Sequence, residues 1–245
     1  MGSVHIASSS APALMKNLRA SPRPYHHGDL RDALIEAAVA LVTEEQDWTF
    51  SLREVARRAG VTHNAPYNHF AEKRDLLGAV AAVGFGRLRA RMVAMTADIA
   101  RADASLNTLA QAYIGFAIEN PALYRLMFGP ALAKGHSARP ASALIAGAET
   151  KTVLEGIILR GAQSGIFAVE PEDEEAREMA HLACWSALHG LAMLIIDAKA
   201  ETALTPRIIV ERLMKYLSNG LLKKRGRAKF RRQSASRAGA KRKEN

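Results

Sequence analysis

The sequence predicts an all-α protein of two domains. Apolar side chains recur at the spacing of helix faces from residue 103 to residue 222, and neither strand alternation nor a hairpin signal occurs there. Helix start signals divide this part of the chain at Asn120–Pro121, Glu170–Pro171 and Thr205–Pro206. With 245 residues, the chain can hold one small and one larger helical domain, each with its own core.

The first helix is predicted over residues 29–45 and the second from Ser51. The first has a buried apolar stripe that forms a platform for the next elements, made of Leu30, Leu34, Ala38, Leu41 and Val42. Ser51 and Glu54 have the S-x-x-E spacing of a capping box, in which each side chain binds the other's free backbone amide. Gly60 follows where a helix ends by turning left-handed, which costs glycine no steric strain.

The short helix after Gly60 has two possible starts, because Thr62 or Asn64 can cap it. If Thr62 is the cap, Pro66 occupies the fourth helical position and removes one backbone hydrogen bond. If Asn64 is the cap, Pro66 occupies the second position, where its missing N–H costs nothing, but Asn64 is then a capping residue. In both cases Pro66 and Phe70 are spaced to point inward together, and two short helices joined at a glycine indicate a helix-turn-helix motif.

Residues 29–77 resemble the DNA-binding domain of TetR-family transcriptional regulators. The matching residues are Ser51, Val55, Ala56, Ala59, Gly60, Val61, Tyr67, His69, Phe70, Lys73 and Leu76. The resemblance implies an N-terminal three-helix helix-turn-helix domain over residues 25–75, whose short helix enters the major groove of double-stranded DNA.

The same resemblance implies which side chains contact DNA. The positions nearest the base edges are Thr62, His63 and Asn64. The positions that hold phosphates are Ser51, Tyr67, His69 and Lys73. Arg53 lies off the buried stripe of its helix, among the outward side chains that suit phosphate.

A larger C-terminal helical domain for ligand binding and dimerisation is predicted over residues 76–222. A long helix over residues 72–95 starts beside the reading helix and ends in this second domain, and in the family it links ligand to DNA. The last helix, after Thr205–Pro206, has a predicted stripe of Ile209, Val210, Leu213, Tyr216 and Leu217.

The helix expected to open at Glu170–Pro171 has no charged residue from Met179 to Ile196. One of its faces is the candidate seam of a two-fold dimer, because small residues let a second helix approach closely: Ala180, Ala183, Cys184, Ala187, Gly190 and Leu194. A membrane span is the alternative by length, and His181, Ser186 and His189 argue against it, so no membrane partner is expected.

Trp185, His189 and Gly190 match the W-x-x-x-H-G element of the WHG type of TetR C-terminal domain, and residues 109–128 resemble that type as well. The resemblance implies a cavity for a small hydrophobic effector, lined by Tyr113, Phe116, Leu126, Met127, Trp185 and His189. The alternative for the same residues is a plain hydrophobic core, in which such side chains and a lone histidine are ordinary.

The formal net charge of +10 lies entirely in residues 223–245, which hold 11 Lys and Arg against Glu244. This tail and the leader 1–24 cannot bury a core, so both are expected to be disordered. A tail of this charge favours non-specific, salt-sensitive DNA binding. An architectural DNA-binding protein driven by the tail is therefore the alternative to a sequence-specific regulator.

Catalytic and cofactor motifs are not found in the sequence. Neither G-x-S-x-G, G-x-G-x-x-G nor H-E-x-x-H occurs, and Cys184 is the single cysteine, so no enzyme activity, cofactor or metal site is predicted. One cysteine also suits a reducing, cytoplasmic location. The sequence thus predicts a homodimeric repressor that a hydrophobic effector releases from a palindromic operator.

Overall fold

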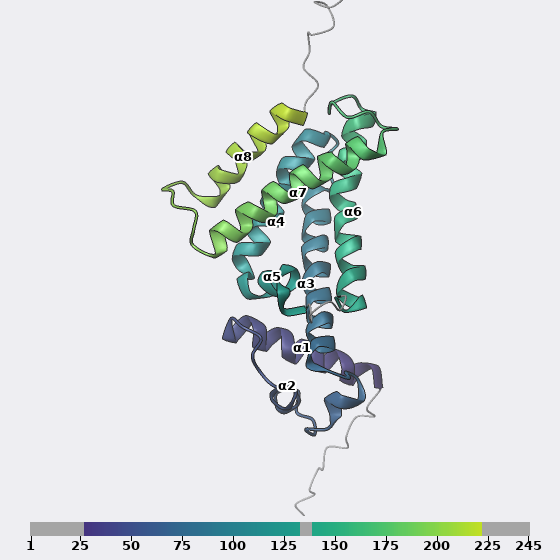
Figure 1. Ribbon diagram of the computed structural model, residues 1–245, viewed down its shortest axis with the longest axis vertical. Helices are drawn as coiled ribbons and strands as arrows, with labels where there is room; N and C mark the ends of the chain where they lie inside the picture. Colours follow the sequence, from purple (N-terminus) through teal and green to yellow (C-terminus); the bar gives the residue numbers. More distant parts are fainter. Residues whose placement is uncertain (1–26, 133–138, 222–245) are drawn as a thin grey trace, which may run out of the picture.

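The computed structural model describes residues 27–132 and 139–221, which form helices and turns with no strand among them. The molecule is elongated, with a small domain at one end and a larger helical domain at the other (Figure 1). The predictions for the leader 1–24 and the tail 223–245 lie outside the described residues. The all-α, two-domain prediction is confirmed for the part that is described.

The small domain consists of α1 (His27–Glu45), α2 (Leu52–Arg58), the 3₁₀ helix η1 (Ala65–Asn68) and the first turns of α3 (Lys73–Thr96). Its core buries side chains from α1, α2 and α3 and from the segments between them, as predicted: Leu34, Ala38, Val42, Phe50, Val55, Phe70 and Leu76. Burying apolar area of this kind is the main favourable term in folding a small helical unit. The platform predicted on α1 is confirmed.

The capping box at the start of α2 is present in both directions. The Ser51 amide donates to Glu54 Oε2 at 2.8 Å, and the Glu54 amide donates to Ser51 Oγ at 3.2 Å. These bonds lower the pKa of the Glu54 carboxyl, because they stabilise its charged form. Gly60 ends the segment with φ +69°, the left-handed conformation that was predicted.

The reading helix is one short 3₁₀ helix that starts at Ala65. Pro66 lies at the start of this helix and is buried, which agrees with the second of the two predicted starts. Asn64 occupies the N-cap position, but its side chain makes no capping hydrogen bond, and its backbone is helical. Capping by Thr62 or Asn64 side chains is therefore not observed. Backbone bonds hold the turn instead, with the Ala65 amide donating to Thr62 O at 3.0 Å.

The larger domain is a bundle in which α3 packs against α4 (Ala102–Glu119), α5 (Pro121–Phe128) and α6 (Ala141–Gln163). A second 3₁₀ helix, η2 (Pro130–Leu132), follows α5. Helix α7 (Glu174–Ile196) crosses the bundle, and α8 (Pro206–Leu221) lies beside it (Figure 1). Because α3 belongs to both domains, its two ends cannot move independently.

Two predicted details of the last helices are wrong. Helix α7 begins at Glu174 rather than at Glu170–Pro171, because Asp173 caps it by accepting the Ala176 amide at 2.9 Å. Tyr216 was predicted in the buried stripe of α8 and is 79% exposed. The buried side of α8 is set by Val210 and Met214.

The two faces of α7 also differ from the prediction. Ala180 and Cys184 were placed on the dimer seam, yet they point into the core together with His181, Leu188 and Ala192. The exposed stripe of α7 consists of Met179, Leu182, Ala183, Ser186, Gly190 and Leu194. By length and composition alone α7 could cross a membrane, and only 33% of its apolar window is buried.

Candidate functional site

The outer surface of the helix-turn-helix domain consists of exposed polar side chains around η1. Thr62, His63 and Asn64 are all exposed in the turn before η1. Tyr67 follows within η1 with 53% of its surface exposed. Tyrosine combines an apolar ring with a hydroxyl that can bind a polar partner, so this surface is suited to contact another molecule.

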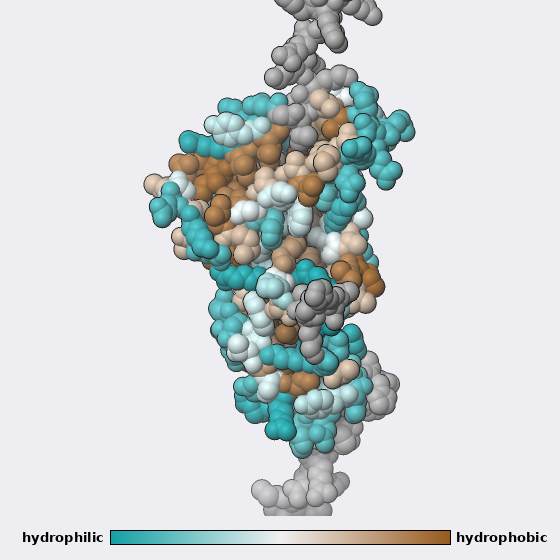
Figure 2. Space-filling view, viewed as in Figure 1, coloured by the Kyte–Doolittle hydropathy of each residue, from teal (hydrophilic) through white to brown (hydrophobic). Residues whose placement is uncertain are grey.

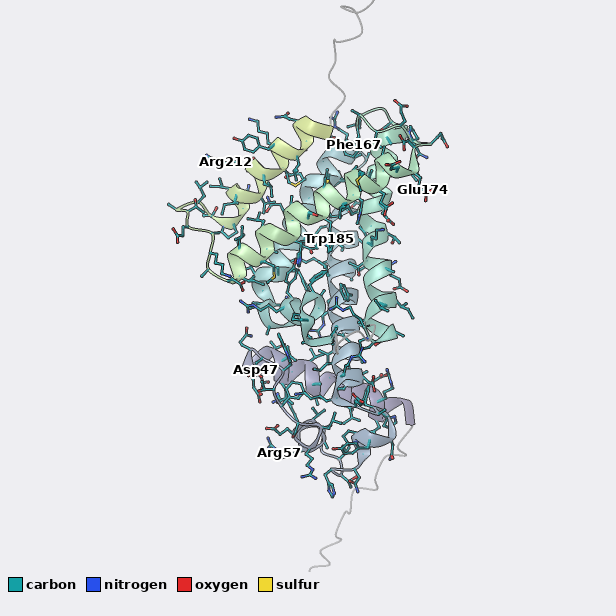
Figure 3. The ribbon with its side chains drawn as sticks, in the orientation of Figure 1. Asp47, Arg57, Phe167, Glu174, Trp185 and Arg212 are labelled. Carbon is teal, nitrogen blue, oxygen red and sulfur yellow. The ribbon has the colours of Figure 1, made fainter. Side chains whose placement is uncertain are left out.

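Basic and polar residues flank this outer surface. Arg53 and Arg57 of α2 are exposed, and Figure 3 shows Arg57 at the outer end of the domain. His69 is half-buried. Lys73 is also half-buried, with its Nζ 5.0 Å from the centre of the Phe50 ring, and burial lowers the pKa of its ammonium group. Ser51 is exposed, although its hydroxyl takes part in the capping box.

Not every basic residue near this surface is available. Arg58 donates from Nη1 to Glu44 Oε2 at 2.7 Å and is held against α1. Arg57, which the sequence placed off the buried stripe but not among the site residues, has no such partner among the described residues. Its exposure and position make it an additional candidate for the outer surface.

The larger domain contains a partly open cavity of about 490 Å³ between α3, α4, α5, α6 and α7. Tyr113, Trp185 and His189 line it, as the sequence analysis predicted. Phe116, Leu126 and Met127, which were predicted with them, are buried in the core and do not belong to the lining. The lining that was missed comes mostly from α3 and α6: Phe85, Met92, Leu144, Gly147, Thr150 and Leu154.

A chain of hydrogen bonds crosses the wall of the cavity. The hydroxyls of Tyr113 and Tyr124 are 2.8 Å apart, and the Tyr124 hydroxyl is 2.8 Å from His189 Nδ1. Burial raises the pKa of Tyr113 to about 12 and also raises that of Tyr124, so both hydroxyls keep their protons. Burial lowers the pKa of His189, which favours the neutral imidazole, and the tautomer of that ring decides whether Nδ1 or the Tyr124 hydroxyl is the donor.

Aromatic rings form part of the cavity wall. The Trp185 ring stacks on His189 with centroids 5.5 Å apart, and Phe128 lies 4.9 Å from His189. Phe128 in turn meets Phe85 of α3 edge-on at 5.2 Å. Trp185 and His189 are four residues apart on α7, so they project from the same side of the helix. The result is an apolar, aromatic pocket with a few polar groups, which is typical of small-molecule sites.

Charged groups also line the cavity. Arg139, Lys151 and Glu178 are part of the lining, together with His181. Lys151 is paired with Glu155 at 3.0 Å. Arg139 precedes α6, and no pattern in the sequence distinguished it from other loop arginines.

A smaller cavity of about 220 Å³ lies where the two domains meet. Trp48, from the segment between α1 and α2, lines it together with Phe128, Gly129, His189 and Met193. Phe128 and His189 therefore border both cavities. Nearby, Arg74 at the start of α3 donates from Nε to Leu132 O at 2.9 Å. The segment from α5 to η2 thus contacts the small domain on one side and the larger cavity on the other.

No group of three or more metal-ligating side chains gathers within residues 27–132 and 139–221.

Two family models match the chain, one for each domain. Residues 34–80 match the model described as "Bacterial regulatory proteins, tetR family", and residues 106–217 match "Tetracyclin repressor-like, C-terminal domain". The second model is not specific to the WHG type, which stays a prediction. None of the curated proteins matches the chain in sequence.

Solved structures share the whole arrangement. A protein of unknown function from Rhodococcus sp. RHA1 is 29% identical, with a TM-score of 0.68, over 82% of this chain and 100% of that one. A regulatory protein of the tetR family from Rhodococcus RHA1 is 24% identical, with a TM-score of 0.56, over 78% and 95%. The regulator FadR from Bacillus subtilis, solved in complex with stearoyl-CoA, is 18% identical, with a TM-score of 0.61, over 77% and 98%.

Proposed function

The chain belongs to the TetR family of transcriptional regulators, and from this premise we propose that it is a repressor that a small hydrophobic effector releases from a palindromic operator. The observation that supports this most directly is the combination of an exposed polar outer surface at one end of α3 with an apolar cavity at the other. One continuous helix connects a site for DNA to a site for an effector, so occupation of either site can alter the other.

In this proposal the turn before η1 reads bases in the major groove. Thr62, His63 and Asn64 face the base edges, with the Asn64 amide placed to pair with N6 and N7 of adenine. Asn64 is available for this because its side chain makes no capping bond. Phosphate contacts come from the residues around this turn, Ser51, Arg53, Tyr67, His69 and Lys73, and they set the orientation of the domain on DNA.

The protein acts as a homodimer in this proposal, through α7 and α8. Figure 2 shows hydrophobic side chains gathered on the face over these two helices. Met179, Leu182 and Leu194 of α7 and Tyr216 of α8 are all exposed there. A contiguous apolar face of this kind marks an interaction surface. In this proposal a second copy of the chain covers the face, so no membrane is needed to bury it. Two copies would present their reading turns to half-sites about 34 Å apart.

The effector occupies the larger cavity and favours a conformation that binds DNA poorly. Tyr113, Trp185 and His189 contact it, and the apolar lining selects a hydrophobic body. The structure of Bacillus subtilis FadR in complex with stearoyl-CoA supports a ligand with a long acyl chain as one candidate effector.

The experiment that tests the proposal is selection of genomic DNA fragments by the purified full-length protein, followed by affinity measurements on the selected sequence. An inverted repeat is expected. His63→Ala and Asn64→Ala should each weaken binding to it by about ten-fold, because one good base contact is worth roughly 1–3 kcal/mol. Arg89→Ala, at an exposed position of α3 in the other domain, is the matched control and should leave the affinity unchanged.

A second arm separates this proposal from the architectural alternative. Binding is measured with and without residues 223–245 over a range of salt concentrations, because that segment holds the whole excess of positive charge. A specific regulator keeps its preference for the inverted repeat after truncation. Loss of all affinity with the tail, or equal affinity for unrelated duplexes, would overturn the proposal.

A further inference from the structure

We propose that the effector is an amphipathic anion, with an apolar body among the aromatic and aliphatic side chains of the cavity and a carboxylate-class oxygen group bound by Arg139. This inference rests on the proposed function, since it names the chemical class of the effector for the same cavity. It starts from one side chain whose bonding is incomplete.

Arg139 is a half-buried cation with too few partners. It lines the larger cavity, and its Nε atom is buried without any hydrogen-bond partner. Nη2 donates to two backbone carbonyls, Met127 O at 2.5 Å and Gly129 O at 3.3 Å. Burial lowers the pKa of the guanidinium, because desolvation penalises its charge. A buried N–H group without an acceptor costs folding free energy. The Nε of Arg139 can therefore gain a hydrogen bond from an acceptor supplied by a ligand.

Two other half-buried arginines have the carboxylate partner that Arg139 lacks. Arg91 pairs with Glu119, and Arg125 pairs with Asp197 at 2.9 Å. Within the described ranges, no carboxylate lies within ion-pair distance of Arg139. Lys151 in the same lining is already neutralised by Glu155 at 3.0 Å. Arg139 is therefore the cavity cation that is open to an anionic ligand, and a guanidinium binds carboxylate through two parallel hydrogen bonds.

The rest of the cavity suits the apolar part of such a molecule. Leu109, Leu154 and Leu188 line it together with the rings of Phe85 and Trp185. An ionised group could not be stabilised among these side chains alone, so the charged group of a ligand belongs at the Arg139 guanidinium. Glu178 is the acidic residue of the lining, and it is exposed, so solvent screens its repulsion.

Binding an anion at Arg139 would also act on the helix-turn-helix domain. The carbonyls of Met127 and Gly129 belong to the end of α5, which Arg139 holds in place. Phe128 and Gly129 then line the junction cavity against Trp48. A carboxylate competes with these carbonyls for the same N–H groups, and an ionised acceptor is the stronger one. Drawing Arg139 away therefore loosens the end of α5 where it meets Trp48.

The test uses two probes of equal length that differ in charge, decanoate and 1-decanol, with the full-length protein. Binding is followed by calorimetry and by the fluorescence of Trp185 in the cavity. Decanoate is expected to bind about ten-fold more tightly than 1-decanol, because the charged hydrogen bonds are available only to the acid. Arg139→Gln should remove this preference, because glutamine can still donate to the α5 carbonyls but has no charge.

Arg91→Gln is the matched control, since it removes a half-buried arginine that lies outside the cavity lining and already has a carboxylate partner, Glu119. It should change the affinity for either probe by less than about two-fold. Arg139→Lys keeps the charge and should retain part of the preference for decanoate. Circular dichroism and the melting temperature establish that each variant is folded before binding is compared.

Three results would overturn the inference. The wild-type protein could bind both probes equally, it could bind neither, or Arg139→Gln could keep the preference for decanoate. DNA binding without any probe reports on the proposed function separately. A protein that binds its inverted repeat but shows no Arg139-dependent preference would refute the inference alone. Arg139-dependent binding of decanoate by a protein without DNA specificity would refute the proposed function alone.

Discussion

Gly60 is a residue whose backbone conformation, rather than its contacts, matters for the fold. Its φ is +69°, and a Cβ built there would meet nothing within 4 Å. Gly60→Ala is therefore expected to lower the free energy of unfolding by about 1–2 kcal/mol through backbone strain alone. Gly60→Asn should cost less, because asparagine tolerates this conformation. Urea unfolding of both variants checks this, and equal losses would contradict the strain explanation.

His189 is expected to make stability depend on pH. Burial lowers its pKa below the ordinary value of 6.5, so the folded protein keeps it neutral while the unfolded chain takes up a proton. The free energy of unfolding should therefore fall as the pH drops from 6.5 towards the folded pKa. His189→Gln keeps a side-chain amide that can bond to Tyr124 and does not titrate, so its melting temperature should fall less between pH 7 and pH 5.

The pH dependence of stability that remains in His189→Gln is expected to come from His181. Burial also lowers the pKa of His181, which faces Lys151, Glu155 and Glu178. His181 therefore has the same sign of effect as His189. A wild-type protein whose stability does not change over this range would show that neither histidine stays neutral in the fold.

At the scale of elements, the close approach of α3 to α5 depends on Gly84. A Cβ at this position would lie 2.6 Å from Met127 Sδ and 3.1 Å from Leu123 Cγ. Gly84→Ala is expected to destabilise the protein by about 1–3 kcal/mol, because the two helices must separate or repack. Since α3 and α5 both reach the small domain, DNA affinity should also fall.

Gly86 provides a control on the same helix. It is exposed and a Cβ there would meet nothing within 4 Å, so Gly86→Ala should stabilise α3 by about 0.5–1 kcal/mol through helix propensity. The pair is compared by urea unfolding at one protein concentration, since stability of a dimer depends on concentration. The free energy of unfolding is expected to fall in Gly84→Ala and to rise in Gly86→Ala. A destabilised Gly86→Ala protein would contradict the packing of α3 described above.

At the scale of the whole molecule, dimer formation can be separated from folding at Gly190. This residue lies in the exposed stripe of α7, and a Cβ there would meet nothing within 4 Å. Gly190→Arg should leave the monomer folded but place a charge in the proposed interface, which strongly disfavours association. Light scattering is expected to show monomers, with operator affinity reduced by about 100-fold or more because the two half-sites are no longer linked.

Gly86→Arg is the matched control, since it adds the same side chain at an exposed position of α3. It should stay dimeric and bind DNA as the wild type does. A Gly190→Arg protein that remains dimeric would show that α7 is not the interface.

The helices and most of the small domain could be predicted from local signals. The capping box at Ser51 and Glu54 and the left-handed Gly60 depend on neighbours in sequence, and both were found as expected. The stripe on α1 could be predicted because helical period alone decides which side chains share a face. The predicted start of α7 was wrong, because Asp173 rather than Glu170 caps the helix and Pro171 lies outside it.

The cavity could be predicted only in part. Trp185 and His189 have a spacing that places them on one face, and both line it together with Tyr113. Phe116, Leu126 and Met127 have the same apolar character but point elsewhere, since the direction of a side chain depends on how its helix is rotated in the bundle. Tyr124 was missed although it joins Tyr113 to His189, because residues 11 and 65 positions apart meet only after folding.

The sequence by itself determined the all-α class and the helix-turn-helix motif, because these depend on period, caps and turns that act over a few residues, and its resemblance to TetR regulators indicated the family. Tertiary structure alone decided which face of α7 is buried, which side chains line the cavity and why Arg139 differs from other arginines. Each of these depends on partners far away in the chain, and burial and hydrogen bonding are properties of the assembled helices rather than of any one segment.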